Sequence, residues 1–485
     1  MTLETEMATA AAPARMREID DLPSPPGLPF FGNLLQVDRA RIHQQVERWV
    51  GQYGPYFRFQ LGNRRILAIA DHAAMGALLR DRPDGFRRTK KLAEISAEIG
   101  SAVGVFGAEG EVWKRQRRMV MAGFDPRHLR AYFPSLVAVS ERLAGRWGRA
   151  ADGAAPIDLQ GDLMRYTVDT VAGLAFGAEV NTLESDADVI QQHLDKIFPA
   201  LFRRMFAAVP TWRWWKSPAD RELDRSVAAV AAAIQGFIAA ARRRLEDSAR
   251  RAAPKNLLEA MIVAADDPES GITPSEVHGN VLTMLLAGED TTANTLAWAI
   301  WLLTRNPEAL ARARAEVDAV SPGASGWTLE RLAELAFLEA CANETMRLKP
   351  VAPFIMLQAL RETRIADIRV PTGTLVWAAL RTDTVREDYF AEPTRFDPDR
   401  WLHDHAAPST TSANRVAMPF GAGPRVCPGR QLAMLEIKMA LATLLGAFEI
   451  ESVTPAAGVE PDELMSFTMS PSALTMRLRE RRPAA

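Results

Sequence analysis

Apolar residues recur at helical spacing over most of the chain. Residues 223–248 and 307–320 are rich in Ala, Leu, Arg and Glu and have the pattern of amphipathic helices. A longer periodic stretch runs from Thr273 to Asn306. These stretches predict that helices make up most of the fold.

The stretch from Thr273 to Asn306 predicts the longest helix. Thr273-Pro274-Ser275-Glu276 combines a capping Thr, a Pro at the first helical position and a Glu three residues after the cap, and Pro307 ends the pattern. At 1.5 Å a residue, this helix is about 45–50 Å long, enough to cross a domain. Gly288 and Thr291 are weak helix formers at its centre, which is typical of a functional distortion.

Three regions have the character of short strands. Residues 56–70 alternate around Gly62-Asn63, which predicts a hairpin, and residues 353–376 contain Thr and Val around a Pro-Thr-Gly turn. Residues 467–478 predict a second hairpin, which turns at Ser470-Pro471. The predicted fold class is mainly α with a small β region.

Composition narrows the class of protein. Hydrophobic residues make up 48% of the chain and charged residues 24%, as in ordinary globular proteins. The net charge of −2 provides no field to attract nucleic acid, so we expect no nucleic-acid partner. Two cysteines favour a reducing compartment, and the N-terminal stretch lacks the apolar run of a signal peptide or anchor. We therefore expect a cytoplasmic protein without a transmembrane anchor.

Neither a linker nor a repeat divides the chain beyond its N-terminal region. Residues 1–22 are polar and Ala-rich, and we expect them to be flexible. The Pro-rich segment 23–29 is stiff and non-helical because proline fixes φ. We expect residues 23–485 to form a single domain.

The strongest chemical signal is the segment Phe420-Gly421-Ala422-Gly423-Pro424-Arg425-Val426-Cys427-Pro428-Gly429. Its glycines allow a tight loop whose backbone N–H groups can point at one sulphur atom. A helix predicted over 429–445 would bring its positive end close to that atom. Both effects stabilise a thiolate. The alternative is a small buried cysteine beside a turn, the usual fate of an isolated cysteine.

This segment resembles the cysteine-ligand loop of cytochromes P450, Phe-Gly-x-Gly-x-Arg-x-Cys-x-Gly, at all of its specified positions. The resemblance implies the P450 fold, with the long central helix crossing above a haem b cofactor. It implies that Cys427 is the axial ligand of the haem iron. It also implies that Phe420, Arg425 and Gly429 contact the cofactor, with Arg425 paired to a propionate.

Two positions bear on the other propionate contacts. Trp113 and Arg117 match the family's Trp-x-x-x-Arg, whose members contact a propionate. Gln358 stands where many family members have a basic partner, and it cannot serve as a cation. The resemblance therefore implies that Trp113, Arg117 and Arg425 bind the propionates.

A third pattern implies a structural network. Glu344 and Arg347 match Glu-x-x-Arg, and at this spacing they share one helix face. Arg395 lies in a segment similar to the family's Pro-x-Arg-Phe. By the resemblance, Arg395 completes a buried network with Glu344 and Arg347 that holds the cysteine loop.

The centre of the long helix, Ala287-Gly288-Glu289-Asp290-Thr291, matches the family's Ala/Gly-Gly-x-Asp/Glu-Thr. The resemblance implies that Ala287 lies against the haem and that Asp290 and Thr291 are catalytic. The carboxyl and the hydroxyl would pass protons through water to the dioxygen that is reduced. The alternative is a polar helix bend without a catalytic role.

The resemblance places the substrate above the haem, against the middle of the long helix. The candidate wall residues are all apolar, and each could equally belong to the core: Val105, Phe106, Leu286, Ala287, Val351, Ala352, Ile355 and Met469. We expect an apolar substrate, namely a fatty acid, terpenoid or steroid. Fatty acids are slightly favoured because a carboxylate could stay near the pocket mouth. The aromatic and cationic residues 198–216 fit a lid better than a membrane-surface segment.

The leading interpretation is a soluble, bacterial-type P450 monooxygenase that inserts one atom of O2 into its substrate. Electrons would come from an external ferredoxin or flavodoxin and its reductase, docked on a basic rim of Lys114, Arg115, Arg118 and Arg430. We expect a monomer. One alternative is a haem-thiolate enzyme that uses peroxide or rearranges its substrate, against which Asp290-Thr291 argues. The other is a non-enzymatic haem sensor, which would need neither a proton relay nor a lid.

Overall fold

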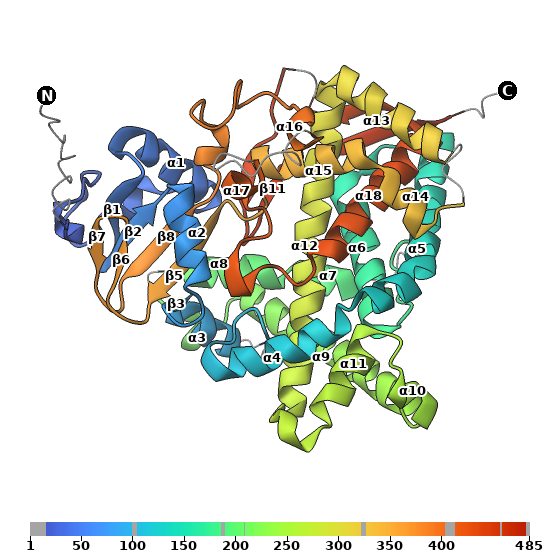
Figure 1. Cartoon of the computed structure of the whole chain (residues 1–485), viewed down its shortest axis with the longest axis horizontal. Helices are drawn as coiled ribbons and strands as arrows, with labels where there is room; N and C mark the ends of the chain where they lie inside the picture. The colour runs from blue at the N-terminus through green and yellow to red at the C-terminus, as the bar shows by residue number, and fades with distance from the viewer. Residues whose placement is uncertain are drawn as a thin grey trace, which may run out of the picture.

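The computed structural model describes residues 16–98, 104–185, 190–207, 209–321, 326–402, 413–455 and 458–481. Helices surround one long central helix, and the largest β-sheet lies to one side of it (Figure 1). The helices are α1 (Ile42–Tyr53), α2 (His72–Arg80), α3 (Lys90–Glu98), α4 (Gly110–Gly123), α5 (Pro126–Asp152), α6 (Leu159–Phe176), α7 (Ile190–Leu194), α8 (Ile197–Met205), α9 (Pro218–Arg244), α10 (Ser248–Ala252), α11 (Leu257–Ala265), α12 (Pro274–Arg305), α13 (Pro307–Val320), α14 (Leu329–Glu334), α15 (Ala336–Leu348), α16 (Asp399–Leu402), α17 (Ala413–Ala417) and α18 (Arg430–Ala447). The strands are β1 (Tyr56–Leu61), β2 (Arg64–Ile69), β3 (Phe86–Arg88), β4 (Ile157–Asp158), β5 (Phe354–Ala359), β6 (Thr363–Ile365), β7 (Ile368–Val370), β8 (Leu375–Ala379), β9 (Phe448–Thr454), β10 (Glu463–Met465), β11 (Met469–Pro471) and β12 (Thr475–Glu480). The mainly α fold class is confirmed.

The central helix α12 begins and ends where the sequence predicts. The Thr273 side chain accepts from the backbone N–H of Glu276, and the Glu276 carboxylate accepts from the N–H of Thr273 at 2.8 Å. The helix is continuous through its centre, so the predicted distortion is wrong. Gly288 instead permits close packing, because a Cβ atom there would lie 2.5 Å from Cγ2 of Val171 on α6.

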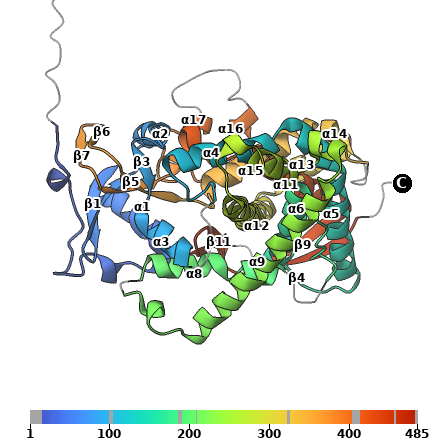
Figure 2. The ribbon, with the colours of Figure 1, turned by 90° about the horizontal axis from the view of Figure 1, so that it is seen from below.

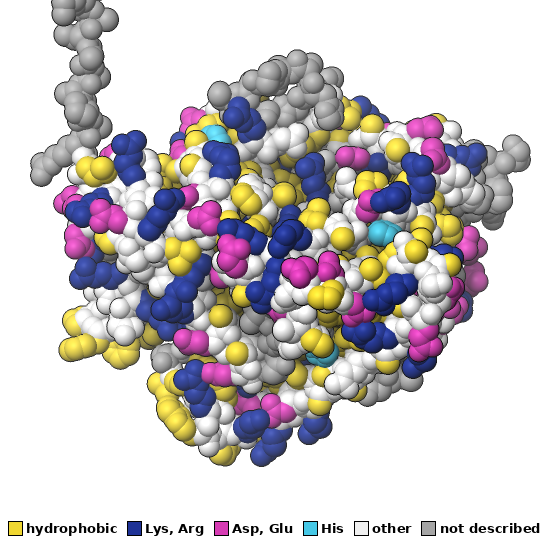
Figure 3. Space-filling view, turned by 60° about the horizontal axis from the view of Figure 1, so that its bottom comes forward, with side chains coloured by type: hydrophobic (Ala, Val, Ile, Leu, Met, Phe, Trp, Pro, Cys, Tyr) yellow, Lys and Arg dark blue, Asp and Glu magenta, His cyan; other side chains and the backbone are white. Residues whose placement is uncertain are grey.

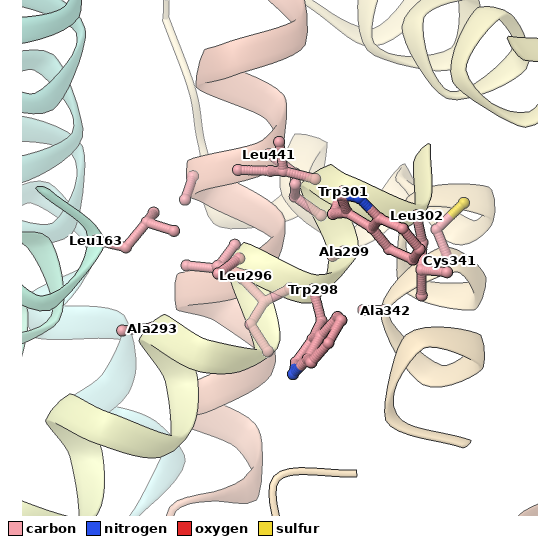
Figure 4. Close-up of a cluster of buried hydrophobic side chains, with 14 of the residues drawn as sticks. Leu163, Ala293, Leu296, Trp298, Ala299, Trp301, Leu302, Cys341, Ala342 and Leu441 are labelled. Atoms are coloured by element: carbon pink, nitrogen blue, oxygen red, sulfur yellow. The ribbon is translucent and has the colours of Figure 1, made fainter. Parts of the chain in front are cut away.

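The second half of α12 runs through the larger hydrophobic core. Leu296 and Trp298 are fully buried there, together with Leu163 of α6 and Leu441 of α18 (Figure 4). The first half of α12 packs in a second core with α4, α6, α9 and α11. Burial in two cores fixes α12 as the axis about which the other elements are placed.

The main sheet has the strand order β1-β2-β8-β5-β3. Its first two strands form the predicted hairpin, with Tyr56 opposite Ile69. The predicted C-terminal hairpin is wrong: β10 pairs with β11 around a turn at residues 466–468, and β12 pairs with β9 and β4. The partner of β12 lies more than twenty residues earlier in the chain, and a local alternation pattern cannot reveal such a pairing.

The prediction that residues 1–22 are flexible is wrong for residues 17–22. Residues 1–15 lie outside the described part of the chain. Arg17 pairs through its backbone with β7 and through its side chain with Asp367 at 2.7 Å, and Leu22 is 3% exposed. Residues 17–22 are therefore part of the folded domain.

Helix α9 covers one face of the molecule beside α12 (Figure 2). By length and composition it could cross a membrane. Length and composition suit a covering helix equally well, and α9 contacts α7, α11 and α12. On the face shown in Figure 3, basic and acidic side chains are interspersed, in keeping with the net charge of −2.

Candidate active site

Cys427 lies in the loop between α17 and α18. The loop closes through a hydrogen bond from the N–H of Cys427 to the carbonyl of Phe420 at 3.0 Å. Gly423 has φ +72°, and a Cβ atom there would lie 2.5 Å from the carbonyl oxygen of Leu79, so only glycine fits. Helix α18 begins at Arg430, as predicted.

Burial raises the pKa of the Cys427 thiol, while the N–H groups of Gly429 and Arg430 and the charge of Arg117 oppose that rise. The side chain is nevertheless solvent-accessible. A thiol that is enclosed by protein and still accessible faces an internal space. Its thiolate needs a nearby cation, and a metal ion supplies one.

A cluster of guanidinium groups flanks this loop. Arg117 donates to the carbonyl of Val426 at 2.8 Å, and Arg425 donates to the carbonyl of Ala108 at 2.6 Å and to the carboxylate of Glu109. The Arg425 guanidinium carbon lies 4.6 Å from the centre of the Trp113 ring. The fold therefore brings together three residues that two separate motifs predicted, namely Trp113, Arg117 and Arg425.

Two further arginines in this cluster were missed by sequence reasoning. Arg82 is 4% exposed, and its Nε and Nη2 atoms have no hydrogen-bond partner among the described residues. Burial and the charge of Arg425 lower the pKa of Arg82 to about 10. Arg88 donates to the carbonyl of Phe106 at 2.7 Å, and burial lowers its pKa well below the ordinary value. Isolated arginines follow no motif, so no sequence signal marked them.

The middle of α12 presents one accessible residue and several buried polar ones. Ala287 is solvent-accessible although α12 lies at the centre of the molecule. The hydroxyl of Thr291 donates to the carbonyl of Ala287 at 2.6 Å, so it is bound to its own helix. Asp290 accepts from the amide of Asn294 at 2.9 Å and from the hydroxyl of Thr468 in the β10–β11 turn. Burial raises the pKa of Asp290 to about 6.

The buried network that supports the loop differs from the prediction in one member. Glu344 and Arg347 are fully buried and joined by two 2.7 Å hydrogen bonds. The prediction for Arg395 is wrong, because its side chain is 60% exposed and pairs with Glu392, while only its carbonyl accepts from Arg347. Arg400 takes its place, with Nε 3.4 Å from Glu344. Helix α16 turns Arg400 inward and leaves Arg395 outside.

The family model for cytochrome P450 matches residues 22–477. The chain belongs to the cytochrome P450 family. The human mitochondrial 25-hydroxyvitamin D-1 alpha hydroxylase is 28% identical and covers 92% of this chain and 90% of its own length. Pentalenene oxygenase of Streptomyces avermitilis is 30% identical, covering 76% and 78%. Carotene epsilon-monooxygenase of Arabidopsis thaliana is 25% identical, covering 87% and 78%.

A solved structure shows the same fold. The haem domain of cytochrome P450DA superposes with a TM-score of 0.81 at 24% identity, over 97% of this chain and 99% of that one. The protein is thus a P450 monooxygenase by family, and the family's cofactor is haem b bound through a cysteine thiolate.

The residues of this P450 fit that cofactor. Haem b carries two propionates, which Arg82, Arg88, Arg117 and Arg425 would hold; in the structure the carboxylate of Glu109 accepts from Arg425. The unpartnered N–H groups of Arg82 and the Nε of Arg425 are donors that two carboxylates would satisfy. Cys427 lies just before α18, Ala287 lies on α12, and these two helices pack together. Both residues have accessible surface.

The candidate substrate walls fall into two groups. Those with accessible surface are Phe106, Val351, Ala352 and Ile355, whereas Val105 and Leu286 are buried. The prediction for Met469 is wrong, because it is fully buried, with its sulphur 3.8 Å from Arg381. Phe467, at the hairpin turn, is partly exposed instead: its ring stacks on Phe198 of α8 at 4.5 Å and lies 6.0 Å from Phe106. The mislocated hairpin hid Phe467 from sequence reasoning.

Proposed function

We propose that this P450 inserts one atom of O2 into an apolar substrate, with Cys427 as the axial ligand of its haem. The observation that carries the proposal is the enclosed Cys427 thiol, held by two backbone N–H groups and Arg117. When bound, haem supplies the reductive activation of dioxygen. Purified enzyme given NADPH and a surrogate redox pair should incorporate one labelled oxygen atom from O2. Product formed with peroxide alone, and none with O2, would overturn the proposal.

Asp290 and Thr291 are proposed to deliver protons. With a pKa of about 6, the carboxyl of Asp290 can both hold and release a proton near neutral pH. Thr291 can pass that proton on when its hydroxyl leaves the carbonyl of Ala287. The presence of this pair favours oxygen chemistry over a sensor, which would not need it.

Coupling between electron use and product formation tests this role. Thr291→Ala and Asp290→Asn should still bind substrate and haem but should form less product and more peroxide per NADPH consumed. Thr304→Ala is the matched control, because Thr304 also bonds its own helix, α12, but at its far end. Unchanged coupling in both variants would remove the pair from the mechanism.

The proposed substrate is a terpenoid or a steroid-like molecule. Relatives of this chain include a carotene epsilon-monooxygenase, a 25-hydroxyvitamin D-1 alpha hydroxylase and a pentalenene oxygenase. The stacked rings of Phe198 and Phe467 form an apolar surface against which a rigid hydrocarbon can pack, and the Phe106 ring, with the Arg88 guanidinium over it, lies at the edge of this surface. A panel of terpenoids, steroids and fatty acids should show a low-spin to high-spin change of the haem with the first two classes. A change produced only by fatty acids would overturn this substrate class.

Electrons are proposed to come from a separate ferredoxin or flavodoxin and its reductase. Arg118 and Arg430 are exposed, whereas Lys114 and Arg115 of the predicted rim pair with Glu111 and Glu276 at 2.7 Å. An acidic partner would therefore meet chiefly Arg118 and Arg430, and its docking should weaken with salt.

We also propose that the protein is a cytoplasmic monomer. The two cysteines, Cys341 and Cys427, form no disulfide, in keeping with a reducing compartment. Cell fractionation and gel filtration at micromolar concentration test the two parts separately. Enrichment with membranes, or a concentration-dependent dimer, would contradict them.

A further inference from the structure

Two carboxyl groups meet between the central helix and the turn that joins α7 to α8. Glu289 of α12 is 3% exposed, and its Oε1 atom has no hydrogen-bond partner among the described residues. Asp195 lies in the turn, where protein surrounds most of its carboxyl group although the residue keeps accessible surface. The carboxyl groups of Asp195 and Glu289 interact with each other, and the side-chain amide of Gln191 on α7 also donates to Asp195. A carboxyl pair of this kind holds together only if at least one member carries a proton.

Glu289 does not belong to the proton relay proposed above. At 3.6 residues per turn, its side chain leaves α12 on the side opposite Ala287 and Thr291. On that side the hydroxyl of Thr167 on α6 donates to the carbonyl of Glu289 at 3.1 Å. The buried carboxyl of Glu289 therefore faces the packing of α6 and α7 and needs another explanation.

The surroundings of the pair favour a shared proton. Burial and the nearby carboxyls of Asp195 and Asp290 raise the pKa of Glu289 well above the ordinary value. Burial also raises the pKa of Asp195 to about 6. The nearest cations are engaged elsewhere: Lys196 with Glu222 at 2.6 Å, and Arg165 with the carbonyl of Ser185 at 2.7 Å.

The turn that carries Asp195 leads directly into α8, which together with the stacked rings of Phe198 and Phe467 forms the proposed cover of the substrate space, called the cover below. Helix α8 begins at Ile197, and Phe198 stacks on Phe467 with an interplanar angle of 6°. Thr468, next to Phe467, donates to Asp290 of α12. The cover is thus connected to α12 at two points, one through the β10–β11 turn and one through Asp195.

We propose that Asp195 and Glu289 are positioning residues, which share one proton, fasten the α7–α8 turn to α12 and so hold Phe198 over the substrate space. The proposal rests on the proposed function only in assigning that space to substrate. Loss of the shared proton leaves two adjacent carboxylates, whose repulsion releases the turn. Because the closed state binds this proton more tightly than the open state, closure is complete at low pH and is lost as pH rises through the pKa of the pair.

Hydrogen exchange of residues 190–205 in the ligand-free holoenzyme tests the fastening without turnover. After correction for intrinsic exchange, opening should increase by up to tenfold for each pH unit above about 4, the ordinary pKa of a carboxyl group, until the closed pair itself loses its proton. In Glu289→Gln the amide donates permanently to Asp195, so the segment should stay protected and the pH dependence should disappear. Asp195→Asn should behave in the same way.

Glu436→Gln is the matched control. Glu436 of α18 is 1% exposed and bonds Thr292 of α12, away from the α7–α8 turn. This variant should keep the wild-type pH dependence of exchange at 190–205. The affinity of a spin-shifting ligand should weaken with pH in the wild type and in Glu436→Gln, but not in Glu289→Gln.

The same pH dependence in Glu289→Gln and wild type, or its equal loss in Glu436→Gln, would overturn the proposal. Exchange does not depend on oxygenation, so this outcome would leave the monooxygenase test intact. Conversely, an enzyme that failed to oxygenate any substrate could still show the fastening.

Discussion

Replacing Thr468 with Val removes one hydrogen bond to the proposed catalytic acid without changing side-chain shape. Thr468 is 5% exposed, and its hydroxyl donates to the carboxylate of Asp290. That bond stabilises the ionised form and lowers the pKa of Asp290 against the larger effect of burial, which raises it to about 6. Its loss should therefore raise this pKa further.

The size of the shift follows from the strength of the bond. A hydrogen bond to a charged group contributes about 1.5–3 kcal/mol, and about 1.4 kcal/mol corresponds to one pKa unit. The bond from Asn294 at 2.9 Å remains in the variant and limits the change. We expect an increase of about one unit.

The assay is product formed per NADPH consumed, measured across pH. Above the pKa of Asp290 the carboxyl has no proton to deliver, so the pH of half-maximal coupling should move up by about one unit in Thr468→Val. Thr468→Ser keeps the hydroxyl and should retain the wild-type profile. Identical profiles for Thr468→Val and wild type would refute the assignment of Asp290 as the titrating group.

Three further predictions concern stability, cofactor binding and electron transfer. Arg347→Ala should lower the free energy of unfolding by about 3–5 kcal/mol, because it leaves Glu344 buried without its partner. Arg395→Ala should change the free energy of unfolding by less than about 1 kcal/mol. Chemical denaturation of the two variants measures both changes. Arg82→Leu should weaken haem retention on gel filtration with little effect on the fold, and unchanged retention would exclude Arg82 as a propionate partner. Charge reversal at Arg118 or Arg430 should slow reduction by an acidic redox partner more than it changes substrate affinity, as stopped-flow absorbance would show; equal rates would place docking elsewhere.

The parts of the site that could be predicted from the sequence are those encoded in contiguous segments. The Cys427 loop and the cap of α12 each specify their geometry through neighbouring residues, so a local pattern suffices. Trp113 and Arg117 belong to one motif and Arg425 to another, and both motifs are contiguous in the sequence. Resemblance to a family therefore supplied long-range contacts that spacing alone would not.

The missed parts depend on packing between distant segments. Arg395 and Arg400 lie in one short segment, and only the turn into α16 decides which guanidinium reaches Glu344. Arg82 has no sequence feature that distinguishes it from a surface arginine. Phe467 was misplaced because β12 pairs with β9 rather than with the strand nearest to it in the chain.

The central claim is that Cys427 binds the haem iron as a thiolate. The most direct test is the absorbance spectrum of the reduced, purified protein with carbon monoxide. The wild type should show the strongly red-shifted Soret band of a thiolate-ligated haem, and Cys427→Ala should lack it, while Cys341→Ala, which changes the other cysteine, should retain it. A red-shifted band that persists in Cys427→Ala would contradict the account.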